Sequence, residues 1–105
     1  MRTERDRLLD ILEAVAKIEQ RVPVSYADFL ADEVTQVWVL HHLQIVGEAA
    51  RGLSSGTLAA MPTIPWQDVV GLRNVVVHQY IGVDLEEVWR TLMNDLPQVV
   101  DAVRS

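Results

Sequence analysis

The amino-acid sequence predicts an all-α protein, an antiparallel up-and-down bundle of about four main helices. Apolar residues recur every three or four positions along most of the chain, which is the spacing of amphipathic helices. No segment alternates apolar and polar residues as a half-buried strand would. The β-branched residues at 75–77 lie among valines that keep the helical spacing. Short connections between the helical segments favour antiparallel neighbours.

The first helix is expected at residues 4–20. Thr3 and Asp6 have the spacing of a capping box at its start. Pro23 and Ser25 then interrupt the helical pattern, and residues 26–31 are expected to form a short helical turn. The apolar stripe of the first helix is formed by Leu8, Ile11, Leu12, Val15 and Ile18.

A long helix is expected at residues 33–53, and it has two apolar faces. Such a helix should be central and largely buried. The small residues Gly47, Ala49 and Ala50 would let another helix or subunit approach closely. We expect His41 to be a hydrogen-bonded, partly buried residue rather than a zinc ligand, because no third ligand has suitable spacing. The sequence predicts no particular role for His42. The two faces are Val34, Trp38, Ile45 and Ala49, and Val39, Leu43, Val46, Ala50 and Leu53.

Three further helices are expected in the second half of the chain. A short one near 56–61 is followed by one from about 66 to 79, with Pro65 near its first turn and Gly82 as a left-handed stop. Asp84, with Glu87, should cap the last helix, and Pro97 should produce a kink near residues 93–97. The apolar stripe of the last helix is Leu85, Val88, Trp89, Leu92, Leu96, Val99 and Val103.

Composition limits the classes of protein and of chemistry. With 105 residues, half of them hydrophobic, the chain is expected to be a single domain, residues 1–105. The absence of cysteine excludes disulfides, thiolate metal sites and cysteine nucleophiles. No apolar run approaches the roughly 20 residues that cross a bilayer, and the charged N-terminus lacks a signal-peptide core. We therefore expect a cytoplasmic protein that does not bind a membrane.

Residues 73–80 form the strongest candidate site. Arg73, Asn74, His78 and Tyr80 place a guanidinium, an amide, an imidazole and a phenol in an otherwise apolar segment. On a helix, Asn74 and His78 share one face. Arg73 and His78 are separated by about 140° and about 7.5 Å of rise, but both could lean toward one groove. The alternative is that these residues are only the polar positions of a helix, with the histidine near its C-terminal carbonyls.

The segment resembles the HEPN superfamily, and in particular its HepT-like branch. The motif there is Arg, four to six residues, then His, usually with Asn after the Arg and, in this branch, Tyr two residues after the His. Arg73, Asn74, His78 and Tyr80 match all four places. The resemblance covers nearly the whole chain, including residues 45–51, 64–66, 71–74, 82–85, 88–89 and 95–97.

The resemblance implies a toxin of a toxin–antitoxin pair that is a metal-independent endoribonuclease without a cofactor. Arg73, Asn74 and His78 would be catalytic. Tyr80 would be the AMPylation acceptor for a partner MNT-type nucleotidyltransferase antitoxin, although packing at the end of the helix is the other interpretation of this residue. HEPN relatives form homodimers, so a homodimer is expected here too.

A second class of function remains open from the residues alone. The net charge of −6 disfavours tight, non-specific binding of RNA, because phosphate-binding proteins usually carry a basic excess. The chain would then be a non-enzymatic binding subunit that docks a nucleotidyltransferase or binds a nucleotide.

Overall fold

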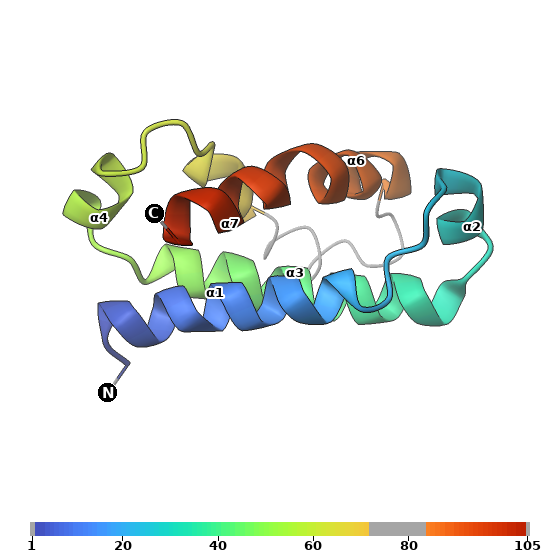
Figure 1. Ribbon diagram of the computed structural model, residues 1–105, viewed down its shortest axis with the longest axis horizontal. Coiled ribbons are helices and arrows are strands. Elements are labelled where there is room, and N and C mark those ends of the chain that lie inside the picture. Colours follow the sequence, from blue (N-terminus) through green and yellow to red (C-terminus); the bar gives the residue numbers. More distant parts are fainter. Residues whose placement is uncertain (1, 72–83, 105) are drawn as a thin grey trace.

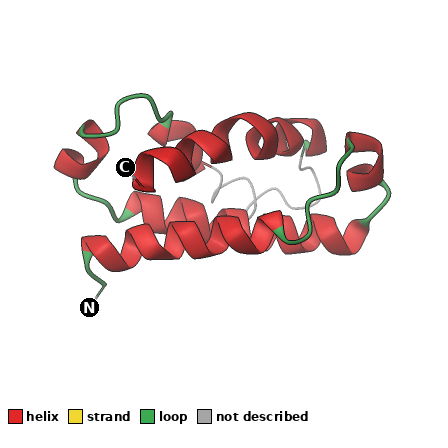
Figure 2. Ribbon diagram, viewed as in Figure 1, coloured by secondary structure: helices red, strands yellow, loops and turns green. Residues whose placement is uncertain are grey.

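The computed structural model describes residues 2–71 and 84–104, and within these two ranges all regular structure is helical. Figure 2 shows these helices joined by short loops. The predicted all-α class is therefore confirmed. In chain order the helices are α1 (Glu4–Glu19), α2 (Tyr26–Leu30), α3 (Glu33–Arg51), α4 (Ser55–Ala59), a helical segment at residues 66–71, α6 (Leu85–Arg90), the π-helix η2 (Thr91–Asp95) and α7 (Leu96–Arg104).

The two long helices α1 and α3 run side by side in opposite directions (Figure 1). At one end, Glu4 at the start of α1 accepts a hydrogen bond of 2.7 Å from the backbone N–H of Ser54, just beyond α3. At the other end, the indole N–H of Trp38, near the start of α3, donates to the carbonyl of Lys17 at 2.8 Å. These two links set the antiparallel register.

The core lies between the α1–α3 pair and the C-terminal helices α6, η2 and α7, which form the opposite layer in Figure 1. Burying these side chains is the main favourable contribution to folding in a chain of this size. The largest fully buried side chains among the described residues are Ile11, Val15, Ile18, Phe29, Val39, Leu43, Val46, Val69 and Val99.

Helix starts follow the capping residues that the sequence predicts. The Thr3 hydroxyl accepts from the Asp6 N–H at 3.0 Å and the Asp6 carboxylate accepts from the Thr3 N–H at 3.0 Å, so the capping box is confirmed. Asp84 caps α6 by accepting from the N–H groups of Glu86 and Glu87. These side chains satisfy backbone donors that have no partner within the first turn of a helix.

The expectation that α3 is largely buried on both apolar faces is wrong for its N-terminal half. The face that contains Val39 and Leu43 is fully buried, but Val34 is 66 % exposed and Trp38 is only partly covered. The reason is geometric. The neighbouring helix α1 and the C-terminal layer lie on one side of α3, so its opposite side keeps an exposed apolar surface.

The last helical region contains a wide turn at residues 91–95, next to the position where the sequence predicts a kink, near residues 93–97. At η2 the Leu96 N–H bonds to the Thr91 carbonyl, five residues earlier instead of four. Pro97 explains this widening, because it has no N–H and its ring would clash with the carbonyl of Met93 in a regular helix. The stripe predicted on this region packs inward, with Val88, Leu92, Leu96 and Val99 all buried.

Candidate functional site

The helical segment at residues 66–71 leads into the predicted motif and is firmly anchored. The Pro65 carbonyl accepts hydrogen bonds from the N–H groups of Asp68 and Val69, at 3.0 and 3.1 Å. The indole N–H of Trp66 donates to the Met61 carbonyl at 3.1 Å, and this side chain is only 9 % exposed. The start of the motif helix at residue 66 is therefore confirmed, with Pro65 directly before it as predicted.

The motif itself lies outside the described residues. This holds for Arg73, Asn74, His78 and Tyr80, and also for the expected stop at Gly82. The approach of the Arg73 and His78 side chains to a common groove thus stays a prediction. The described part of the site consists of the segments on either side, which are the 66–71 helix and the capped start of α6 at Asp84.

A pocket of about 440 Å³ lies between the 66–71 helix and the helices α6 and η2. It combines three carboxylates, from Asp68, Glu87 and Asp95, with one guanidinium, from Arg90. An excess of carboxylates repels phosphate, so this pocket does not suit an RNA backbone. The lining residues are Gln67, Asp68, Val69, Gly71, Glu87, Arg90, Thr91, Asn94 and Asp95.

The Asp95 carboxyl has an altered proton affinity in this pocket. Its burial raises its pKa above the usual 3.8, and the negative charge of Asp68 raises it further, while Arg90 acts in the opposite direction. The sequence analysis missed this group, because Asp68 and Asp95 are far apart in the chain and meet only through the packing of the 66–71 helix against η2.

The prediction for the paired histidines named the wrong residue. His41 is exposed, whereas His42 is the buried one, at 8 % exposure. The Nδ1 atom of His42 lies 2.8 Å from the Trp38 carbonyl, and its ring packs 4.5 Å from the Trp38 ring. The two adjacent residues point about 100° apart on a helix, and α1 packs on the side that carries His42. His42 is a structural residue of the α1–α3 pair.

No three histidine, aspartate or glutamate side chains gather in a way that could hold a metal ion within residues 2–71 and 84–104. In the same ranges, none of the helices has the length and apolar character needed to span a membrane.

The fold and the position of the motif together define a class of protein. A bundle of antiparallel helices whose later part carries Arg and His separated by four residues is the pattern of a HEPN domain. The comparison with protein families is more specific. A model described as "Ribonuclease HepT-like" matches residues 11–105, and the chain belongs to this HepT-like family.

Relatives with curated names are similar over almost their full lengths. "Probable ribonuclease HepT" from Thermococcus cleftensis is 35 % identical over 99 residues, covering 93 % of this chain and 90 % of the relative. "Putative RNase MJ1380" from Methanocaldococcus jannaschii is 33 % identical over 93 residues, covering 88 % and 85 %. "Putative RNase TTE0752" from Caldanaerobacter subterraneus is 30 % identical and covers 99 % of this chain and 94 % of the relative. No solved structure gives a significant match.

Proposed function

We propose that this chain is a metal-independent endoribonuclease and the toxin component of a toxin–antitoxin pair. One observation carries the proposal. The family match extends through residues 73–80, where every position of the Arg–Asn–His–Tyr motif is occupied, and the relatives that share this region are named as ribonucleases.

The proposed chemistry uses the 2′-hydroxyl of RNA as an internal nucleophile. His78 takes the proton of this hydroxyl, whose oxygen attacks the adjacent phosphorus. The bond from phosphorus to the 5′-oxygen breaks, and the leaving oxygen receives a proton. The products are a 2′,3′-cyclic phosphate and a 5′-hydroxyl. An imidazole suits this task because its ordinary pKa lies near neutrality.

Arg73 stabilises the charge that develops on the non-bridging oxygens, because its planar guanidinium matches two phosphate oxygens. Asn74 orients the imidazole or bonds the substrate, since it lies four residues before His78 on the same helix face. In this scheme no step requires a metal ion or a cofactor.

In-line attack on the phosphorus needs a base that deprotonates the 2′-hydroxyl and an acid that protonates the leaving 5′-oxygen. Each chain supplies only one motif histidine. We propose that a homodimer brings two copies of the motif to one cleft, so that the second His78 protonates the leaving oxygen. A chain that cleaves RNA as a monomer would contradict this part of the proposal.

Regulation is proposed to act through Tyr80. An MNT-type nucleotidyltransferase antitoxin would transfer AMP to its phenolic oxygen. The added phosphate would place negative charge and bulk beside Arg73 and His78, which would repel an RNA backbone.

The test compares wild type with His78→Ala on RNA in the presence of a chelator. Wild type should cleave and leave 2′,3′-cyclic phosphate ends, and the variant should be slower by about 100-fold or more, the usual contribution of a general acid–base group. His41→Ala is the matched control, because this imidazole is exposed on α3. Cleavage that the chelator abolishes, or that survives the loss of His78, would refute the mechanism.

The non-enzymatic alternative is favoured by the net charge of −6 and by the acidic pocket between the 66–71 helix and the helices α6 and η2. It expects no cleavage by the wild-type chain but stable binding of the nucleotidyltransferase. Equal growth of cells that express wild type or His78→Ala would support it.

A further inference from the structure

Two helix faces form the walls of the acidic cavity of about 440 Å³. Gln67 and Gly71 lie four residues apart and share one face of the helix that leads into the motif. Glu87, Thr91 and Asp95 recur every four residues along α6 and η2 and form the facing wall. The volume lies within the range of about 300–1,000 Å³ that small-molecule sites occupy, so the cavity is large enough for a planar ring system.

The charged side chains of this cavity have hydrogen-bonding capacity that the protein does not use. None of them takes part in a hydrogen bond or an ion pair with another described residue; they are Asp68, Glu87, Arg90 and Asp95. Burial and the charge of Asp68 raise the pKa of the Asp95 carboxyl, while Arg90 lowers it. A ligand that donates hydrogen bonds to the Asp95 carboxylate would stabilise its ionised form.

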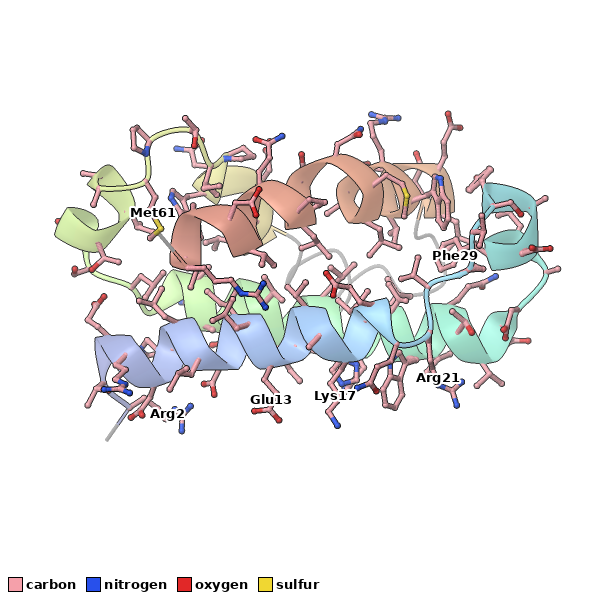
Figure 3. The ribbon with its side chains drawn as sticks, in the orientation of Figure 1. Arg2, Glu13, Lys17, Arg21, Phe29 and Met61 are labelled. Carbon is pink, nitrogen blue, oxygen red and sulfur yellow. The ribbon has the colours of Figure 1, made fainter. Side chains whose placement is uncertain are left out.

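The charges of the cavity define which ligand it suits. Three carboxylates face a single guanidinium, that of Arg90. In Figure 3, the basic residues Arg2, Lys17 and Arg21 lie along the edge of α1 that points away from α6 and α7, so they do not neutralise the cavity. A group that fits must present mainly N–H donors, must offer an acceptor to Arg90 and must carry no negative charge.

Guanine has this set of donors and acceptors. Its N1–H and its 2-amino group lie side by side and can donate together to one carboxylate. Its O6 and N7 atoms can accept two hydrogen bonds from one guanidinium. Adenine, cytosine and uracil lack the adjacent pair of donors, so the combination of carboxylate and guanidinium discriminates against them.

The cavity is also close in the chain to the motif of the proposed cleavage. Gly71 lines the cavity and precedes Arg73 by two residues, so the chain cannot hold their Cα atoms more than about 7.6 Å apart. In a nucleotide, the base and the phosphate lie on opposite sides of one ribose. A base in the cavity would leave its phosphate outside, away from the carboxylates and within reach of a long arginine side chain.

We propose that this cavity binds a guanine base of the RNA substrate and so selects the position of the cut. Asp95 accepts hydrogen bonds from N1–H and the 2-amino group, and Arg90 donates to O6 and N7. Asp95 has this role because it is the half-buried carboxylate, where water competes least, whereas Asp68 and Glu87 are exposed. The inference rests on the proposed ribonuclease function, but binding of the base does not itself require cleavage.

The first test measures binding of free nucleosides to the full chain by NMR titration. Guanosine should bind more tightly than adenosine, cytidine or uridine. Inosine, which is guanosine without the 2-amino group, should bind about tenfold more weakly than guanosine, because one carboxylate oxygen loses its donor.

The same titration on Asp95→Asn tests the residue assignment. The amide replaces one acceptor by a donor that opposes the N–H groups of guanine, so guanosine should bind about tenfold more weakly than to wild type. Asp101→Asn is the matched control, because it makes the same change at an exposed position of α7 outside the cavity and should bind like wild type. Equal affinities for all nucleosides, or equal binding of guanosine to wild type and Asp95→Asn, would overturn the inference.

The second test maps the cleaved ends on RNA of mixed sequence. Wild type should cut next to guanosine, and inosine at the same position should slow the cut about tenfold. Asp95→Asn should still cut but should lose this preference. Cleavage without any preference for guanosine would refute the inference and leave the proposed ribonuclease intact. Binding of guanosine without cleavage of RNA would sustain the guanine site and refute the ribonuclease.

Discussion

The Glu4 carboxylate accepts a hydrogen bond of 2.7 Å from the Thr57 hydroxyl, 53 residues further along the chain. Its other oxygen accepts from the Ser54 N–H, which is the N-cap of α4. One side chain thus connects the first turn of α1 to the end of the α3–α4 connection. Charge-assisted bonds of this kind are stronger than neutral ones, so the link is sensitive to pH.

We predict that Glu4→Gln lowers the melting temperature at neutral pH by a few degrees. The hydrogen bonds from Thr57 and Ser54 lower the pKa of Glu4 below its usual 4.5. The folded state therefore binds the proton less tightly than the unfolded state. The contribution of the link is fully present above about pH 4.5 and is lost as the pH falls through the lowered value.

Thermal melts between pH 3 and pH 7, roughly the range of carboxyl titration, check this prediction. Wild type and Glu4→Gln should converge toward the acidic end. Glu13→Gln, an exposed change on the same helix, should remain close to wild type throughout. A constant difference between wild type and Glu4→Gln at all pH values would show that the charge of Glu4 is not involved.

Asp95→Asn should change the stability at neutral pH in the opposite direction to Glu4→Gln. The pKa of Asp95 is raised by its burial and by Asp68, so the folded state binds a proton more tightly than the unfolded state. Stability is then lost as the pH rises from about 3.8 through the raised value. At neutral pH the variant should be more stable than wild type by less than about 1 kcal/mol, because solvent screens this partly exposed site. Urea titrations at pH 4 and pH 7, bracketing that range, measure the change, with Asp101→Asn as an exposed control.

Trp66→Phe should destabilise the protein by about 1–3 kcal/mol. The substitution removes the indole donor to the Met61 carbonyl at a position where the indole is nearly buried, and it leaves this acceptor with only the longer bond of 3.3 Å from the Ile64 N–H. Denaturant unfolding gives the magnitude. Trp89→Phe is the comparison, since Trp89 contacts Phe29 and Tyr26 ring to ring and a phenyl group can keep most of that packing. A smaller loss of unfolding free energy for Trp66→Phe than for Trp89→Phe would argue against a stabilising contribution from the hydrogen bond between Trp66 and Met61.

Tyr80→Phe should cleave RNA like wild type but should escape neutralisation by a nucleotidyltransferase partner. The phenyl ring keeps the size and apolar character of the tyrosine ring and lacks the oxygen that would accept AMP. Mass spectrometry after incubation with the partner and ATP should show the added AMP on wild type only. Modification of the variant at an unchanged level would exclude Tyr80 as the acceptor.

The sequence alone predicted the helical class, the starts of α1, the 66–71 helix and α6, and a disturbance caused by Pro97, which was expected as a kink and is found as the π-helical turn η2. These features depend on local chemistry, such as the Thr3–Asp6 capping box and the missing N–H of a proline, so a short stretch of sequence contains their cause. The motif at residues 73–80 was also visible in the sequence, and the family match supports it, while its geometry lies outside the described residues.

Only the tertiary structure decided which side of each helix is covered. His42 rather than His41 is buried, Val34 and Val37 remain exposed, and Asp68 meets Asp95 in one pocket. Helical spacing assigns residues to a face but does not say which face meets a neighbour. That depends on how α1 and the C-terminal helices pack on α3, which is a sum of contacts between residues far apart in the chain.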